Sequence, residues 1–171
     1  MTIDIVNYKK SIYSRCTKIK DNHNLMKNFK NKVAAITGAG SGIGQQLALL
    51  LAKAGCHVSL SDVNEQGLAK TVGLLQGSNV RVTTKKLDVS DRLAMQAWAE
   101  ETVQNHGSVN MIFNNAGVAL GSTVEGASYE ELEWIVGINF WGVVYGTKEF
   151  LPYIKKTGDG HIINITSIFG L

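Results

Sequence analysis

Short runs of apolar, β-branched residues alternate along the chain with longer segments in which apolar residues recur every three or four positions. Runs of the first kind are typical of strands, and segments of the second kind are typical of helices. Glycines punctuate the pattern, as at Gly55 and Gly107. The pattern predicts strands over 33–37, 57–61, 80–87, 109–113 and 161–166. It predicts helices over 42–55 and 65–75, a third one capped by Ser90 or Asp91 and ending near 106, and a long one from Ser128 to about 156.

The predicted strands and helices alternate, which favours β-α-β units, because parallel neighbouring strands need a crossover connection. We interpret the strands as apolar throughout rather than alternating, as expected for a sheet that helices cover on both faces. The predicted fold class is therefore α/β, with a doubly wound parallel sheet in three layers. No internal repeat or low-complexity linker interrupts the pattern.

Composition excludes several classes of protein. Hydrophobic residues make up 44% of the 171 residues and charged residues 18%, which is typical of a globular domain. No apolar run approaches the roughly 20 residues that a transmembrane helix needs, so no membrane partner is expected. Cys16 and Cys56 are too few and too far apart for a disulfide framework or a zinc cluster. We therefore expect no metal and a reducing, cytoplasmic location.

The net charge of +3 comes from one end of the chain. Residues 1–25 contain five basic and two acidic residues, so the rest of the chain is balanced and gives no reason to expect a nucleic-acid partner. We predict that 1–25 is a basic, disordered N-terminal extension, because Met26 would be a natural start. A surface-binding or organelle-targeting arm is the alternative. Residues 26–171 are then the folded domain.

The loop between the first strand and the first helix reads Thr-Gly-Ala-Gly-Ser-Gly-Ile-Gly, residues 37–44. A dinucleotide's pyrophosphate requires close backbone approach, free N–H groups and the positive end of a helix, all of which such a loop supplies. A purely structural turn is the alternative interpretation. The predicted cofactor-binding residues of this loop are Gly38, Ser41, Gly42, Ile43 and Gly44.

Acidic and amide residues follow the next strands. Asp62 ends the second strand, 18 residues after Gly44. A carboxylate there can accept both ribose hydroxyls of NAD and would repel the 2′-phosphate of NADP, so NAD is the predicted cofactor and NADP is less favoured. Asp88-Val89, after the third strand, is predicted to lie by the adenine. Helix capping is the alternative for each aspartate.

The fourth strand is followed by Asn114-Asn115-Ala116-Gly117, a turn whose amides can bind backbone or ligand. Together with the glycine loop, Asp88-Val89 and Ile163-Asn164-Ile165-Thr166-Ser167, this turn resembles the classical short-chain dehydrogenase/reductase family. The similarity covers about residues 28 to 171 and implies a Rossmann-type dinucleotide-binding domain.

The resemblance also implies roles for individual residues. Asn115, Ala116 and Gly117 would support the sheet and line the cofactor cleft. Asn139 would anchor a water in the proton relay, and Ser167 would bind the substrate's carbonyl or hydroxyl. Judged from the residues alone, a structural serine and an asparagine that satisfies neighbouring backbone remain the alternatives. The implied activity is hydride transfer between nicotinamide and a small alcohol or carbonyl substrate, in a full-length form that is a homo-oligomer.

One part of the family pattern is missing. The family's acid/base is a tyrosine followed four residues later by lysine, about a dozen residues beyond the serine, and none of the five tyrosines here has a lysine at that position. We therefore expect a C-terminally truncated, catalytically incomplete chain whose sheet is incomplete at its C-terminal side. The alternative is a non-catalytic dinucleotide-binding or interaction fragment. A reading frame downstream of Leu171 that encodes Tyr-x-x-x-Lys would favour the truncated enzyme.

The remaining aromatic residues have no predicted role in catalysis. Trp98 and Trp134 are expected in the core or at a partner contact rather than against a cofactor. Trp141 is expected to pack on the sheet or at a subunit contact.

Overall fold

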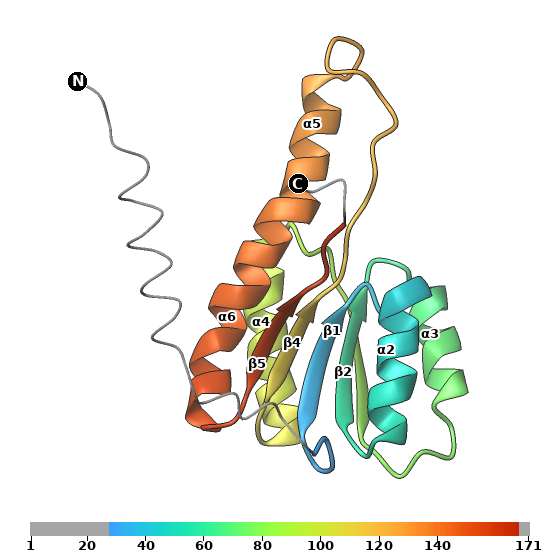
Figure 1. Cartoon of the computed structure of the whole chain (residues 1–171), viewed down its shortest axis with the longest axis vertical. Coiled ribbons are helices and arrows are strands. Elements are labelled where there is room, and N and C mark those ends of the chain that lie inside the picture. The colour runs from blue at the N-terminus through green and yellow to red at the C-terminus, as the bar shows by residue number, and fades with distance from the viewer. Residues whose placement is uncertain (1–27, 168–171) are drawn as a thin grey trace, which may run out of the picture.

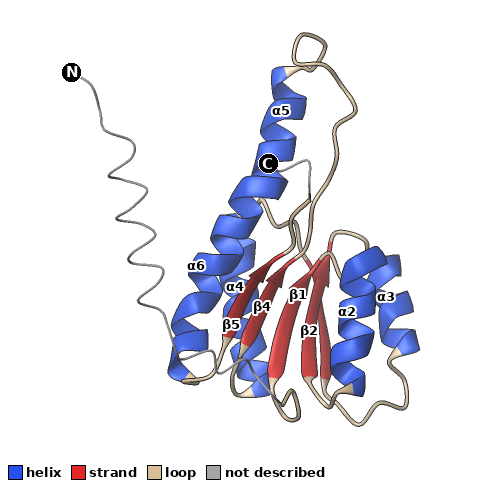
Figure 2. Cartoon of the chain, viewed as in Figure 1, coloured by secondary structure: helices blue, strands red, loops and turns tan. Residues whose placement is uncertain are grey.

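The structure, a computed structural model, describes residues 28–167, so the predicted extension over 1–25 lies outside the described residues. The described strands form one parallel sheet: β1 (Val33–Thr37), β2 (His57–Asp62), β3 (Val82–Lys86), β4 (Met111–Asn114) and β5 (His161–Asn164). The helices are α2 (Gly42–Lys53), α3 (Glu65–Leu74), α4 (Arg92–His106), α5 (Tyr129–Val136), the π-helical η1 (Gly137–Trp141) and α6 (Gly142–Lys156). The predicted α/β fold is confirmed (Figure 2).

The strand order is β3-β2-β1-β4-β5, so the sheet grows outward from β1 in both directions. Helices α2 and α3 pack against β1 and β2, whereas α6 packs against β4 and β5 and beside α4 (Figure 1). The chain adds β2 and β3 on one side of β1 and then crosses over to add β4 and β5 on the other side. The loops that follow β1 and β4 therefore lead away from each other. A crevice at that point is where open α/β sheets bind their ligands.

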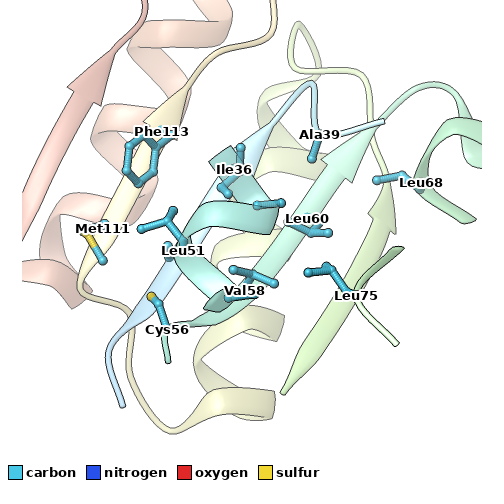
Figure 3. Packing of buried hydrophobic residues seen from close by; sticks show 13 residues of the cluster. Ile36, Ala39, Leu51, Cys56, Val58, Leu60, Leu68, Leu75, Met111 and Phe113 are labelled. Carbon is cyan, nitrogen blue, oxygen red and sulfur yellow. The ribbon is translucent and has the colours of Figure 1, made fainter. Parts of the chain in front are cut away.

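Successive residues of β1 point to opposite faces of the sheet, and each face has its own core. Ala34 and Ile36 belong to the cluster under α2 and α3, which Figure 3 shows around Ile36 and Leu60. Val33 and Ala35 belong to the cluster under α4 and α6. The two-sided burial predicted for the central strands is confirmed by β1, whose five residues are all buried.

In the second core, the Trp98 ring meets Phe150 edge-on with 4.9 Å between ring centroids. Trp98 is almost completely buried, as the sequence predicts. Its indole Nε1 donates to Ser59 Oγ at 3.0 Å, which satisfies the ring's one polar group inside the core.

The prediction that every strand is apolar is wrong for β3. This strand covers Val82–Lys86 rather than 80–87, and none of its residues is fully buried. It forms an edge of the sheet, where Lys85 pairs with Glu101 and Lys86 pairs with Glu65. Charged side chains on an edge strand discourage further strand pairing. β5 is the other edge of the described sheet, and it ends at Asn164 rather than 166.

The long helical region from Ser128 to Lys156 is confirmed, with a π-helical segment inside it. Ser128 Oγ accepts from the Glu131 amide, and the Glu131 carboxylate accepts from the Ser128 amide, which forms a capping box. Figure 1 shows α5 rising beyond the carboxyl ends of the strands. Within 28–167, no helix combines the length and the apolar character that crossing a membrane requires.

Candidate functional site

The loop after β1 contains glycines in backbone conformations that other residues rarely adopt. Gly38 has φ +65° and Gly42 has φ +52°, so side chains at these positions would strain the turn. At Gly44 the limit is space instead, because a Cβ there would lie 2.6 Å from Asn115 Nδ2. The loop therefore combines a tight turn with close packing against the segment that follows β4.

The loop leads directly into the first turn of α2. Ser41 is the N-cap residue, and its side chain makes no capping hydrogen bond to that turn. The first amide groups of a helix have no partner within the helix, and the end that carries them bears a partial positive charge. Ser41, Gly42 and Ile43 line a cavity at this end of α2, an arrangement suited to a phosphate group.

Asp62, the last residue of β2, lies beside the same loop. Its Oδ2 accepts from the Gly40 amide at 2.8 Å, and its Oδ1 accepts from the Asn64 amide at 2.9 Å. The cap of α3 is Asn64, whose side chain accepts from the Gly67 amide. The alternative interpretation of Asp62 as the helix cap is therefore wrong, and its carboxylate faces the glycine loop.

Asp88 and Val89 follow β3 and line the same cavity. Asp88 Oδ1 accepts from the Ser90 amide at 2.9 Å and from Ser90 Oγ at 2.7 Å. The cap of α4 is Asp91, which accepts from the Ala94 amide at 3.0 Å. Of the two predicted caps for this helix, Asp91 is the correct one, and Asp88 shapes the loop that borders the cavity.

The turn after β4 is tied to the end of β1. Asn115 Nδ2 donates to the carbonyl oxygens of Thr37 (2.9 Å) and Gly38 (3.3 Å). Thr37 Oγ1 accepts from the amides of Asn115 and Ala116 at 2.9 and 3.0 Å. Asn115, Ala116 and Gly117 also line the cavity, so the turn both braces the sheet and borders the space above it.

The cavity measures about 580 Å³, within the range of small-molecule sites. Among the described residues, it brings together every predicted cofactor-binding residue except Gly44, which packs behind the loop. Sequence reasoning missed part of the lining: Val63, Leu87, Val118, Trp134 and Ile138. Val63 and Leu87 adjoin predicted residues in the sequence, whereas Trp134 in α5 and Ile138 in η1 reach the cavity only through the tertiary arrangement. Trp134 is 48% exposed, so it does not lie in the core, and the alternative of a partner contact stays a prediction.

The charged residues in the described lining are both acidic, Asp62 and Asp88. Strand pairing places one basic residue near Asp62, because Lys86 on β3 is its register partner. The two residues are far apart in the sequence, so this proximity could not be predicted from it. Lys86 Nζ is hydrogen-bonded to Glu65 Oε2 at 3.0 Å. The neighbourhood of Asp62 therefore contains a second carboxylate in the cavity lining, Asp88, and a lysine that pairs with Glu65.

The two residues predicted to act in catalysis lie outside the described cavity lining. Asn139, in η1, binds both backbone polar groups of Val118: Oδ1 accepts from the amide at 2.9 Å and Nδ2 donates to the carbonyl at 2.8 Å. It thereby holds the loop after Gly117 against the helix. Ser167 is exposed and lies three residues beyond the end of β5.

Two residues with shifted pKa values lie at the other end of the sheet, near the amino-terminal ends of the strands. Burial raises the pKa of Cys56, just before β2, to about 12, while a backbone hydrogen bond to Ala34 lowers it less. Burial lowers the pKa of His106 to about 4, with further lowering by Arg81 and His57.

Within 28–167, His, Cys, Asp and Glu side chains form no group of three or more suited to a metal.

Comparisons with known proteins identify a family model and relatives that match this chain. The sequence model of the family described as short chain dehydrogenase matches residues 32–171. The chain is 49% identical over 146 residues to SadH of Mycobacterium tuberculosis, covering 85% of this chain and 53% of SadH. It is 38% identical over 145 residues to a cyclohexanol dehydrogenase of Acinetobacter sp., covering 84% of this chain and 57% of that enzyme.

Among solved structures, a short chain dehydrogenase/reductase from Burkholderia phymatum in complex with NAD is 38% identical. The two structures match with a TM-score of 0.81 over 85% of this chain and 52% of that chain. The chain thus spans just over half the length of these relatives.

Proposed function

The chain belongs to the short-chain dehydrogenase family, and from that premise we propose that it forms the NAD-binding part of an oxidoreductase. The whole protein would move a hydride between the nicotinamide of NAD and the carbon of a small alcohol or carbonyl compound. The observation that carries the proposal is one cavity that contains both the glycine loop at the start of α2 and the Asp62 carboxylate. A relative named cyclohexanol dehydrogenase supports the substrate class.

Each part of the dinucleotide has a proposed partner on the chain. The amides of Ser41, Gly42 and Ile43 would bind the pyrophosphate, because they lie at the positive end of α2. Asp62 would accept hydrogen bonds from the adenosine ribose. Asp88 and Val89 would border the adenine. Asn115, Ala116 and Gly117 would border the half of the cofactor that crosses toward β4.

Asp62 is also the proposed basis for a preference for NAD over NADP. Its carboxylate would repel a 2′-phosphate, and the nearby Lys86 pairs with the Glu65 carboxylate at 3.0 Å. Removing the carboxylate in Asp62→Ala should weaken NADH binding by about tenfold or more, the worth of hydrogen bonds to a charged group. NADPH binding should weaken less, so that the ratio of the two dissociation constants moves toward one.

The measurement is a titration of the full chain with NADH and with NADPH, followed by cofactor fluorescence. Asp62→Asn removes the charge but keeps an acceptor for the Gly40 amide, so it separates electrostatic repulsion from damage to the loop. Asp159→Asn is the matched control, because that carboxylate pairs with Lys32 at the amino-terminal ends of the strands, outside the described cavity lining. An unchanged NADH/NADPH ratio in both Asp62 variants would contradict the assigned role.

Asn139 and Ser167 remain predictions as catalytic residues, with Asn139 anchoring a relay water and Ser167 orienting the substrate oxygen. Within the 171 residues no tyrosine is followed four residues later by lysine. A phenol with a pKa near 10 is a poor base at pH 7 without such a cation. We therefore expect this chain to bind NADH weakly and to give no turnover with cyclohexanol and NAD. Robust turnover by the purified chain would refute this expectation.

Two further inferences concern the whole protein. Phe140 and Trp141 are 55% and 45% exposed on the long helix, which supports the prediction that the full-length form is a homo-oligomer. Sedimentation of the full-length protein would test it. A cytoplasmic location remains a prediction from the two widely separated cysteines of the sequence.

A further inference from the structure

Trp134 occupies an unusual position for a large aromatic residue. It lies on α5, a helix with no buried residue, and its side chain is 48% exposed while lining the cavity. The capping box at Ser128 and Glu131 fixes where this helix begins. An indole that is half exposed at a cavity wall leaves part of its surface available to a ligand.

The helical region that continues from α5 lies close to the loop after β3, through Gly137 of η1 and Gly142 of α6. A Cβ on Gly137 would lie 3.4 Å from Ser90 Cβ, and a Cβ on Gly142 would lie 2.7 Å from Val89 Cγ2. Ile138 follows Trp134 by one helical turn and also lines the cavity. Trp134 lines the cavity from α5, and the segments that continue this helical region, η1 and α6, lie beside Ser90 and Val89.

The order of the strands decides which end of a dinucleotide would lie there. The glycine loop follows β1; β2 and β3 lie on one side of it and β4 and β5 on the other. Asp62, the proposed partner of the ribose, ends β2, so the adenosine half would lie on the β2 and β3 side. Apolar side chains at this end of the cavity are Val63, Leu87 and Val89. Apolar side chains and an aromatic ring suit the flat faces of an adenine base.

We propose that the indole of Trp134 stacks on the adenine base of the bound dinucleotide and contributes to its affinity. This inference rests on the proposed function, since it assigns one more contact in the same cavity. Stacking of a base on an aromatic side chain is worth about 1–3 kcal/mol by substitution. Because the indole is half exposed, the lower part of that range applies, which corresponds to about five- to tenfold in affinity.

The test uses ADP-ribose, which carries the adenosine and pyrophosphate without nicotinamide, titrated calorimetrically into the full chain. Trp134→Leu keeps apolar bulk and helix propensity but removes the aromatic face, and should weaken ADP-ribose about five- to tenfold. Trp134→Phe keeps an aromatic face and should stay within about threefold of the wild type. Trp141→Leu is the control: that ring stacks on Tyr145, with 5.7 Å between centroids, outside the described cavity lining, so its loss should change nothing.

Fluorescence supplies an independent readout. ADP-ribose should quench tryptophan emission in the wild type and in Trp141→Phe, and the quenching should disappear in Trp134→Phe. Wild-type affinity in Trp134→Leu, or an equal loss in the leucine and phenylalanine variants, would overturn the stacking contact while leaving the proposed function intact. Failure of the wild-type chain to bind either ADP-ribose or NADH would overturn both.

Discussion

The ring of His106 shares a 2.9 Å hydrogen bond with Thr83 through Nε2 and lies 6.3 Å from the ring of His57. Burial is the main reason that the pKa of His106 falls from 6.5 to about 4, and electrostatic interactions with Arg81 and His57 lower it further. Between pH 6.5 and 4 the unfolded chain therefore binds a proton at this position that the folded chain does not. The free energy of unfolding should be fully retained above pH 6.5 and fall as the pH drops toward 4.

Urea unfolding across this pH window would measure the effect. One histidine can contribute at most about 1.4 kcal/mol per pH unit, and partial exposure reduces this figure. His106→Gln keeps a polar partner for Thr83 but cannot titrate, so its unfolding free energy should fall less steeply from pH 6.5 to 4. Identical slopes for the two proteins would mean that His106 is protonated equally in the folded and unfolded states.

At the scale of elements, alanine substitution is expected to have opposite effects on stability at two helical glycines, Gly146 and Gly73. A Cβ on Gly146 of α6 would overlap Asn114 Oδ1, and Asn114 is buried with its Nδ2 bonded to Thr147 and Asn164. Gly146→Ala should therefore destabilise the fold by about 1–3 kcal/mol, as overpacking does.

Gly73 of α3 has open space around it, so Gly73→Ala should stabilise the fold by about 0.5–1 kcal/mol through helix propensity. Urea midpoints compare the two variants, and stabilisation by Gly146→Ala would contradict the close packing of α6 on β4.

The order of helices and strands could be read from the sequence because its signals are local. The Ser128–Glu131 cap and the helix stop at Gly107, which is left-handed with φ +82°, each depend on a few neighbouring residues. β3 was misjudged because its polar character follows from its place at the sheet edge, which only the topology determines. Lys86 and Trp134 were missed as neighbours of the site for the same reason, since crossovers bring them there from distant parts of the sequence.

For the whole molecule, the candidate site and the fold are linked through β1. The strand contributes to both cores and ends in the loop that borders the cavity, so a ligand held by that loop should oppose unfolding of both faces together. A ligand that binds only the folded state stabilises it by about 2.7 kcal/mol at a concentration one hundred times its dissociation constant. We expect NADH to raise the free energy of unfolding of the wild-type chain by this amount.

Two variants separate the effect of NADH affinity from the effect of intrinsic stability in this experiment. At the same free NADH concentration, a tenfold weaker Asp62→Ala chain should gain only about 1.4 kcal/mol. Gly73→Ala should start from a higher stability yet gain the full wild-type increment, because Gly73 is absent from the described cavity lining. Urea unfolding with and without NADH supplies all the increments. An equal gain in wild type and Asp62→Ala would mean that NADH binds elsewhere, since a site that uses the Asp62 carboxylate must lose stabilisation in proportion to its lost affinity.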